Sequence, residues 1–140
     1  MDKVITKMEK KLITVAAGVI LNENNQILLV RKKGTQYFMH VGGKLEINES
    51  PEHALIREIR EEIGCEIDIQ SFIGKYETLA ANEKNHCLVS YLYHAKIKSQ
   101  PRLQAELEEI TWLDLQETDI KLAPLTRDIS IPWCKKYLNI

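Results

Sequence analysis

The sequence predicts an α/β (α+β) fold in which a mixed sheet is flanked by helices. Short apolar runs rich in β-branched residues indicate buried strands. Residues 51–63 carry apolar side chains on one side only, as an amphipathic helix does. The order of these elements, from strands to a helix, to further strands and to a last helix, is typical of such a layered fold.

The first part of the chain predicts three extended segments. Residues 13–21 are apolar and β-branched, and the turn cluster at 22–25 separates them from a second apolar run at 26–31. We expect these two strands to form a hairpin. A third extended segment follows at 38–45 and contains a pair of glycines in its middle.

Both ends of the first predicted helix carry clear signals. Ser50 is a good N-cap, Pro51 suits the first helical position, and Glu52 complements the helix dipole. Gly64 is well placed to end the helix in the left-handed conformation. The sequence therefore predicts a helix over residues 51–63.

The rest of the chain predicts more strands and a second helix. The apolar pattern places strands near 66–76, 86–98 and 109–114. Residues 125–138 have helical character, and Pro132 is expected to kink or divide that helix.

Length and composition predict one soluble domain over residues 1–140. Hydrophobic residues make up 44% of the chain and charged residues 28%, and the formal net charge is −1. This balance is typical of a globular protein. It does not favour a nucleic-acid polymer as partner, because such binding needs a strongly basic surface.

The sequence also predicts a cytoplasmic protein with no membrane partner. The polar N-terminal residues 1–11 are not followed by the apolar core of a signal peptide, and the most apolar stretch, 12–21, is about half the length of a membrane span. Cys65, Cys87 and Cys134 are widely spaced and odd in number. We therefore expect free thiols in a reducing compartment and no zinc site or disulfide framework.

Three glutamates share one side of the first predicted helix. Glu58, Glu61 and Glu62 follow an i, i+3, i+4 spacing, so their side chains are neighbours beside the apolar stripe. Such a cluster is often a solvated, charge-rich surface. If it lies in a cleft, a hard divalent cation such as Mg²⁺ or Mn²⁺ would offset the repulsion, because these ions prefer carboxylate oxygens.

The residues around this helix favour the metal site. From Gly43 to Cys65 the sequence reads GKLEINESPEHALIREIREEIGC. This segment resembles the signature of the Nudix hydrolases, G-x5-E-x7-R-E-U-x-E-E-x-G-U, where U is bulky and apolar. Every fixed residue matches at the right spacing, and Cys65 is a soft match at the last U. Val41 stands where many members have proline, at a position that supplies no ligand.

The resemblance implies a Nudix-type α/β/α sandwich with a metal-dependent active site. It implies that Glu58, Glu61 and Glu62 ligate Mg²⁺ or Mn²⁺, with the carbonyl oxygen of Gly42 as a further ligand. Family members differ in their general base, so Glu61 and Glu62 both stay candidates for that role. Three further roles are implied: Glu49 and Arg57 orient the glutamates, Gly43 lets the backbone approach the substrate closely, and Lys44 faces a phosphate.

Two residues outside the motif are candidates by the same resemblance. Many family members place another acidic metal ligand in a later loop, and we choose Glu106 over Glu108 and Glu109. Arg31 ends the second strand, where some relatives have an arginine that contacts the nucleotide. An ordinary strand-end cation is the alternative for Arg31.

Three aromatic residues, Tyr37, Phe38 and Trp112, are possible stacking partners for a base. Residues of this kind more often serve in packing, because their large apolar rings are usually buried. Both interpretations stay open at this stage.

The implied activity is cleavage of a diphosphate bond in a small nucleotide derivative. A metal can neutralise charge on the phosphate oxygens and lower the pKa of an attacking water, whose proton a carboxylate then accepts. The short chain and Arg31 favour a MutT-like enzyme that acts on nucleoside or deoxynucleoside triphosphates. Residues 79–82 carry neither the proline that often marks ADP-ribose hydrolases nor the tyrosine of dinucleoside polyphosphate hydrolases.

Other functions remain open from the sequence. An ADP-ribose or other nucleotide-sugar pyrophosphatase is one alternative. A non-catalytic nucleotide-binding sensor and an isomerase on the same fold are the others. Family members are often dimers, so a homodimer is also expected as an option.

Overall fold

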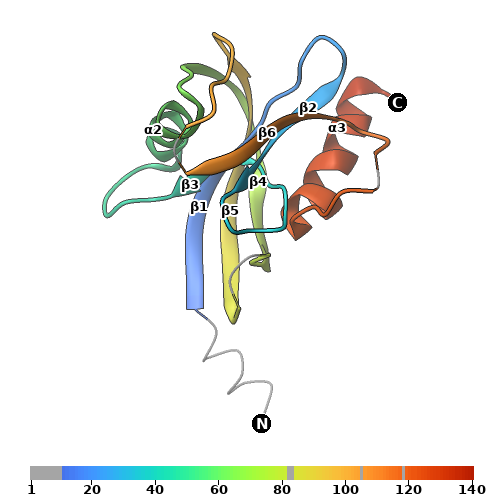
Figure 1. Ribbon diagram of the computed structural model, residues 1–140. Helices are drawn as coiled ribbons and strands as arrows, with labels where there is room; N and C mark the ends of the chain where they lie inside the picture. The colour runs from blue at the N-terminus through green and yellow to red at the C-terminus, as the bar shows by residue number, and fades with distance from the viewer. Residues whose placement is uncertain (1–10, 82–83, 105, 118) are drawn as a thin grey trace.

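The computed structural model describes residues 11–81, 84–104, 106–117 and 119–140 (Figure 1). The polar segment 1–10 and Asn82 lie outside the described residues. The elements along the chain are β1 (Lys11–Val19), β2 (Gln26–Lys32), β3 (Val41–Lys44), α2 (Pro51–Ile63), β4 (Ile67–Leu79), β5 (His86–Ile97), β6 (Leu107–Asp114), the π-helical turn η1 (Thr126–Ser130) and α3 (Ile131–Leu138).

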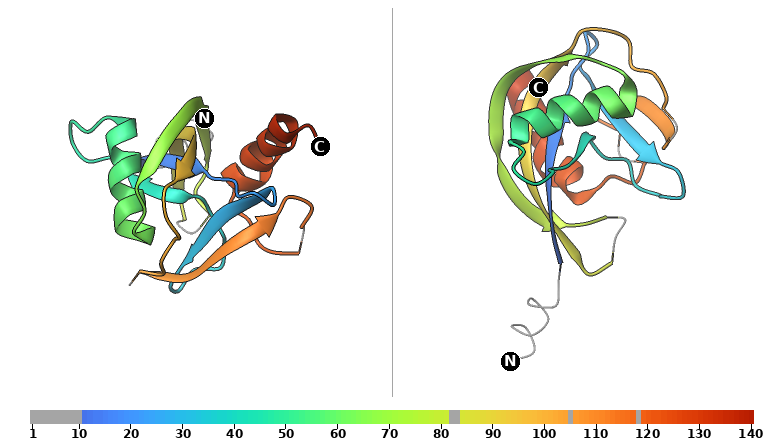
Figure 2. Two further views of the ribbon diagram at one scale, coloured as in Figure 1. Left: turned by 90° about the horizontal axis from the view of Figure 1, so that it is seen from above. Right: turned by 90° about the vertical axis from the view of Figure 1, so that its left-hand side faces the viewer.

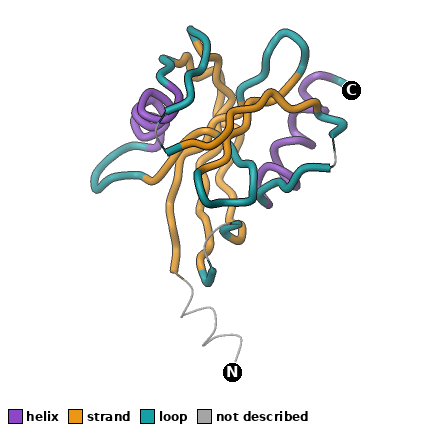
Figure 3. Tube along the Cα trace, viewed as in Figure 1, coloured by secondary structure: helices purple, strands orange, loops and turns teal. Residues whose placement is uncertain are grey.

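The described strands form two sheets. One has the order β3-β1-β5-β4, and β2 and β6 form the other. β1 and β5 are parallel, and the other neighbouring strands are antiparallel. The helices α2 and α3 lie on opposite sides of the strands, as Figure 2 and Figure 3 show. This arrangement confirms the predicted mixed sheet flanked by helices.

β1 is a central strand whose two faces meet different partners. Ala16 belongs to the apolar cluster that includes Leu55 and Ile59 of α2. Its neighbour Ala17 belongs to a second cluster, which includes Ile131 and Cys134 of α3. Because both faces are covered, the continuous apolar run of this strand is explained by burial on two sides.

The predicted hairpin between the first two strands is wrong beyond its turn. One isolated bridge joins Leu21 to Ile27, and the Leu28 amide donates to the Ile20 carbonyl at 2.9 Å. After that point β2 leaves β1 and pairs along its length with β6. The turn was predictable because it depends only on neighbouring residues. Both edges of β1 are hydrogen-bonded to other strands, one to β3 and one to β5.

The predicted helices are confirmed with one refinement. α2 has the predicted bounds. The last helical segment is divided as expected, because the π-helical turn η1 precedes α3 and Pro132 lies in the first turn of α3. No helix within the described part of the chain is long and apolar enough to cross a membrane.

The other strands differ from the predictions mainly at their ends. The strand predicted near 66–76 continues to Leu79 in β4, and the one near 109–114 begins earlier, at Leu107. The extended segment 38–45 forms regular strand only over Val41–Lys44. The three cysteines are free, as predicted, and Cys65 and Cys134 are buried.

His40, which precedes β3, is a buried structural residue. Its Nε2 and Nδ1 atoms contact the hydroxyl groups of Ser130 and Thr126. Burial lowers the pKa of His40 to about 4. The imidazole therefore stays neutral in the folded protein at a pH where it is protonated in the unfolded chain.

We expect this histidine to destabilise the fold as the pH falls from about 6.5 to about 4. The unfolded chain binds one more proton in that window, so the free energy of unfolding falls by up to about 3 kcal/mol. Urea unfolding of the wild type and of His40→Asn at pH 7 and pH 5 measures the effect. The variant should lose less stability between the two pH values than the wild type does.

The exposed His53 provides the control for this experiment. His53→Gln removes a histidine whose side chain is exposed on α2, so it compares the loss of an exposed imidazole with the loss of the buried one. An equal pH dependence in the wild type and His40→Asn would contradict the prediction.

Candidate active site

The sequence of α2 determines which side of the helix packs against the sheet and which side is left for polar residues. The Ser50 hydroxyl accepts the His53 amide at 3.2 Å, and Gly64 ends the helix in the left-handed conformation, with φ of 71°. Leu55 and Ile59 are fully buried against the sheet. The motif glutamates therefore project from a different side of the helix, next to β3.

Two of these glutamates meet the glycine pair of β3. The Gly42 amide donates a hydrogen bond of 3.0 Å to Oε1 of Glu62. Gly43 lies so close to Glu58 that a Cβ atom at Gly43 would be 2.3 Å from the carboxylate carbon. The structure thus brings the predicted helix residues and the predicted glycine bend together, although the motif spacing did not reveal the amide contact.

The two glycines predict different results when each is replaced by alanine. In Gly43→Ala the new methyl group overlaps only the flexible end of Glu58, so we expect an intact fold and at least a tenfold loss of any metal-dependent turnover. In Gly42→Ala the methyl group would lie 2.1 Å from the Ala16 carbonyl oxygen, at φ of 141°. We expect that change to lower the free energy of unfolding by about 2 to 3 kcal/mol.

Chemical denaturation and turnover assays on both variants separate these effects. A Gly43→Ala protein with wild-type activity would contradict the placement of Glu58. A Gly42→Ala protein with wild-type stability would contradict the tight pairing of β1 with β3.

Arg57 connects several of the predicted site residues. Its Nε and Nη2 atoms donate to the two carboxylate oxygens of Glu49, each at 2.8 Å. Nη1 donates to Glu58 at 2.9 Å and to Glu61 at 3.3 Å. Nη2 also donates to the carbonyl oxygen of Lys44 at 3.0 Å. The hydrogen bonds from Arg57 hold the pKa of Glu49 at about 2, so this carboxylate is ionised at neutral pH.

Glu62 has the opposite electrostatic environment. Burial is the main cause that raises its pKa to about 7, and the charges of Glu58 and Glu106 raise it further. The Gly42 amide and the charge of Lys32 act in the other direction. Glu58 and Glu106 therefore each lie near enough to Glu62 for their charges to act on its carboxyl group.

The donor chemistry of this cluster fits a hard divalent cation, because its side chains offer carboxylate oxygens and repel each other without one. The carboxylates of this cluster do not all point to one place in this structure. In the described part of the chain, no three histidine, cysteine, aspartate or glutamate side chains approach closely enough to hold a metal ion. Glu61 is 60% exposed and pairs with Arg57 instead of joining Glu62.

The predicted residues outside the helix have mixed placements. Glu106 lies near the cluster, and its carbonyl oxygen accepts the Lys33 amide at 3.1 Å. The Lys44 side chain is exposed at the end of β3. Arg31 pairs with Glu109 at 2.7 Å on the neighbouring strand. The roles of these residues toward metal or substrate stay predictions.

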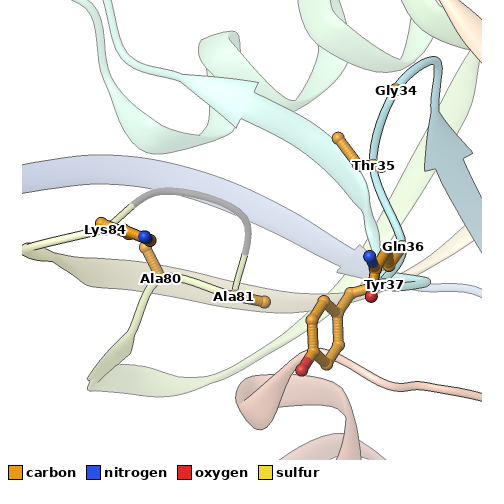
Figure 4. A pocket seen from close by; sticks show the side chains of 7 residues that line it. All are labelled: Gly34, Thr35, Gln36, Tyr37, Ala80, Ala81 and Lys84. Atoms are coloured by element: carbon orange, nitrogen blue, oxygen red, sulfur yellow. The ribbon is translucent and has the colours of Figure 1, made fainter.

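A pocket of about 320 Å³ lies beside the loop that follows β2 (Figure 4). Its walls come from this loop and from the connection between β4 and β5. The lining residues are Gly34, Thr35, Gln36, Tyr37, Ala80, Ala81 and Lys84. At the start of this loop, the Lys33 amide donates to the backbone carbonyl oxygen of Glu106.

The aromatic candidates separate into different environments. Tyr37 lines the pocket, with its ring shown in Figure 4. Phe38 packs against the apolar cluster beside α3, and Trp112 borders a different groove, near the 22–25 turn and the end of α3. Only Tyr37 of these three thus lies at the described pocket.

Three residues near the acidic cluster or the pocket were not predicted from the sequence. Lys32 acts electrostatically on Glu62, and Gln36 and Lys84 line the pocket. The run of basic residues 31–33 at the end of β2 was a usable signal for Lys32. Nothing in the sequence linked Lys84 to the loop after β2, because the chain brings them together only through the folded sheet.

Comparisons with known proteins find a matching family model and similar sequences. The family model described as NUDIX domain matches residues 11–134. The chain is 40% identical over 71 residues to an 8-oxo-dGTP diphosphatase of Escherichia coli, a match that covers 48% of this chain and 55% of that protein. It is 28% identical over 104 residues to an ADP-ribose pyrophosphatase of Methanocaldococcus jannaschii, covering 72% and 62%.

The fold also matches solved structures. A MutT NUDIX hydrolase from Burkholderia pseudomallei superimposes with a TM-score of 0.76 at 23% identity, over 88% of this chain and 98% of that one. The match with the 8-oxo-dGTP diphosphatases spans about half of their length.

Proposed function

Since the chain belongs to the NUDIX domain family, we propose that α2 and the Gly42–Gly43 bend form the active site of a divalent-metal-dependent pyrophosphohydrolase. The observation that carries this proposal is the contact between the two elements. Glu62 accepts the Gly42 amide, and Glu58 lies against Gly43. Two repelling carboxylates are thereby held at one bend of the backbone.

We propose that Glu58, Glu61 and Glu62 would hold Mg²⁺ or Mn²⁺, with Glu106 and the Gly42 carbonyl oxygen as further ligands. When bound, such an ion would supply charge neutralisation on the diphosphate oxygens and a lower pKa for the attacking water. Glu49 and Arg57 position the helix carboxylates through their forked ion pair. Glu61 or Glu62 accepts the proton of the water.

We propose a nucleoside triphosphate as the substrate, in the manner of the MutT-like relatives. The pocket beside Tyr37 suits the nucleoside part, because it offers an aromatic ring and the polar side chains of Thr35 and Gln36. Its volume of about 320 Å³ is that of a small ligand. Lys32, whose charge acts on Glu62, is the cation that we propose for the phosphate chain, together with the exposed Lys44 at the end of β3.

A substrate panel tests the proposal. We expect hydrolysis of a nucleoside triphosphate, with 8-oxo-dGTP and dGTP as first candidates, to a monophosphate and pyrophosphate in the presence of Mg²⁺ or Mn²⁺. Chelation with EDTA should abolish the reaction, and added metal should restore it. Ion-exchange chromatography of the products measures both expectations.

The panel also contains ADP-ribose, because one relative carries the name ADP-ribose pyrophosphatase. Cleavage of ADP-ribose to AMP and ribose phosphate, with triphosphates left intact, would replace the proposed substrate class. Nucleotide binding without turnover of any compound, with metal present, would instead favour a non-catalytic sensor.

A further inference from the structure

Each nitrogen atom of the Arg31 guanidinium group has a partner within the protein. Its Nε and Nη2 atoms donate to Oε1 of Glu109 at 3.2 and 2.7 Å. Nη1 donates to the carbonyl oxygen of Thr35 at 2.9 Å. The group also lies over the ring of Phe38, 5.8 Å from the ring centre. All three nitrogen atoms of Arg31 therefore have partners within the chain.

These contacts connect β6 to the residues 33–38, which we name the pocket loop. The loop starts with the Lys33 amide bonded to Glu106 and ends with the Phe38 amide bonded to Lys121, at 3.1 and 2.8 Å. Arg31 reaches the middle of the loop, at Thr35. Thr35 itself lines the pocket, as do the next two residues of the loop.

We propose that Arg31 is a positioning residue, which shapes the pocket by tying the pocket loop to Glu109, and that it does not bind the nucleotide itself. This inference rests on the proposed function, since it takes the pocket as the substrate pocket. A phosphate that bound Arg31 directly would have to replace Glu109, whose carboxylate already occupies the Nε–Nη2 edge. The Arg31 side chain is only 22% exposed, which limits access further.

The proposal predicts which kinetic parameter changes. Among the described residues, Glu58 accepts a hydrogen bond from Arg57 in α2, and Glu62 accepts one from the Gly42 amide in β3. A less ordered pocket loop should therefore raise KM and leave kcat nearly unchanged.

Three variants test this: Arg31→Met, Glu109→Met and the double variant. Methionine leaves no oxygen at position 109 to accept the Arg31 donors, whereas glutamine would keep one. We expect each single change to raise KM on the order of tenfold, with kcat within about twofold of the wild type, because one charged hydrogen-bond pair is lost in each. The double variant should be no worse than the worse single variant, since both remove the same link. Raised KM in Arg31→Met together with wild-type KM in Glu109→Met would overturn the proposal and indicate direct nucleotide contact.

Glu66→Met is the matched control. Glu66 is 52% exposed, as Glu109 is, and it accepts two hydrogen bonds from Arg60 at 2.6 and 2.7 Å. This pair joins α2 to the residue before β4 and does not join β6 to the pocket loop, so its loss should leave KM unchanged. The control separates a loop effect from the general loss of a surface ion pair.

Hydrogen exchange of the pocket-loop amides in the ligand-free protein gives a readout that does not depend on turnover. We expect faster exchange in Arg31→Met and Glu109→Met and unchanged exchange in Glu66→Met. A wild-type protein that hydrolyses nothing would overturn the proposed function, whatever the exchange rates are. Wild-type exchange in both Arg31→Met and Glu109→Met would overturn the positioning role, whatever the substrate is.

Discussion

Glu62→Gln is expected to lower turnover by at least two orders of magnitude while the protein stays folded. Glutamine keeps an oxygen that accepts the Gly42 amide, so the local geometry can survive. It lacks the negative charge of a carboxylate ligand, so it should bind a divalent cation more weakly, and it cannot accept a proton from water. Steady-state turnover of the best substrate, together with Mn²⁺ titration by calorimetry, measures both losses.

The same variant should be at least as stable as the wild type at pH 8. The pKa of Glu62 is raised to about 7 in the fold, so this group stabilises the fold below about pH 4.5 and loses that contribution as the pH rises through 7. Glutamine removes the cost of a buried charge at high pH. Such a trade of stability for function is common at active sites.

Glu52→Gln, on the same helix but at a variable position of the motif, is the control for Glu62→Gln and should keep wild-type turnover. Full activity and full Mn²⁺ affinity in Glu62→Gln would contradict the proposed site. A lower melting temperature of Glu62→Gln at pH 8 would contradict the electrostatic account.

Replacing Arg57 is the second change with a large expected effect. Both Arg57→Ala and Arg57→Lys should lower turnover by about 10- to 100-fold, the range found when residues that orient metal ligands are removed. Lysine keeps the charge but cannot form the paired bonds to both oxygens of Glu49. The loss in Arg57→Lys should therefore approach the loss in Arg57→Ala.

The carboxyl titration of Glu49, followed by NMR, reports the same change without an assay of activity. Arg57 holds the pKa of Glu49 at about 2, so we expect it to rise toward the ordinary value in both variants. Wild-type turnover in Arg57→Lys would show that charge alone, and not the forked geometry, supports the site.

The sequence predicted the local parts of this molecule well. The α2 helix was found with its caps, because Ser50 and Gly64 act on backbone groups only a few residues away. The acidic side of the helix was also predictable, since residues three and four positions apart are neighbours on any α-helix. The order of strands was found in outline, with ends that differ by a few residues.

The pairing of strands was not predictable in the same way. β1 and β2 are adjacent in sequence, yet β2 pairs with β6, with Leu28 opposite Trp112. Local residue patterns show that a strand is apolar on both faces. They do not show which distant strand covers it, because that choice depends on how the layers pack together.

By itself, the sequence determined the capped helix, its row of glutamates and the motif that identifies the family. These are short-range features, set by backbone hydrogen bonds and helical spacing. Only the tertiary structure decided that Glu62 meets the Gly42 amide, that Arg31 is held by Glu109, and that Lys84 shares a pocket with Tyr37. Each of these contacts joins separate elements of the chain, so it exists only after the strands and α2 have packed against each other.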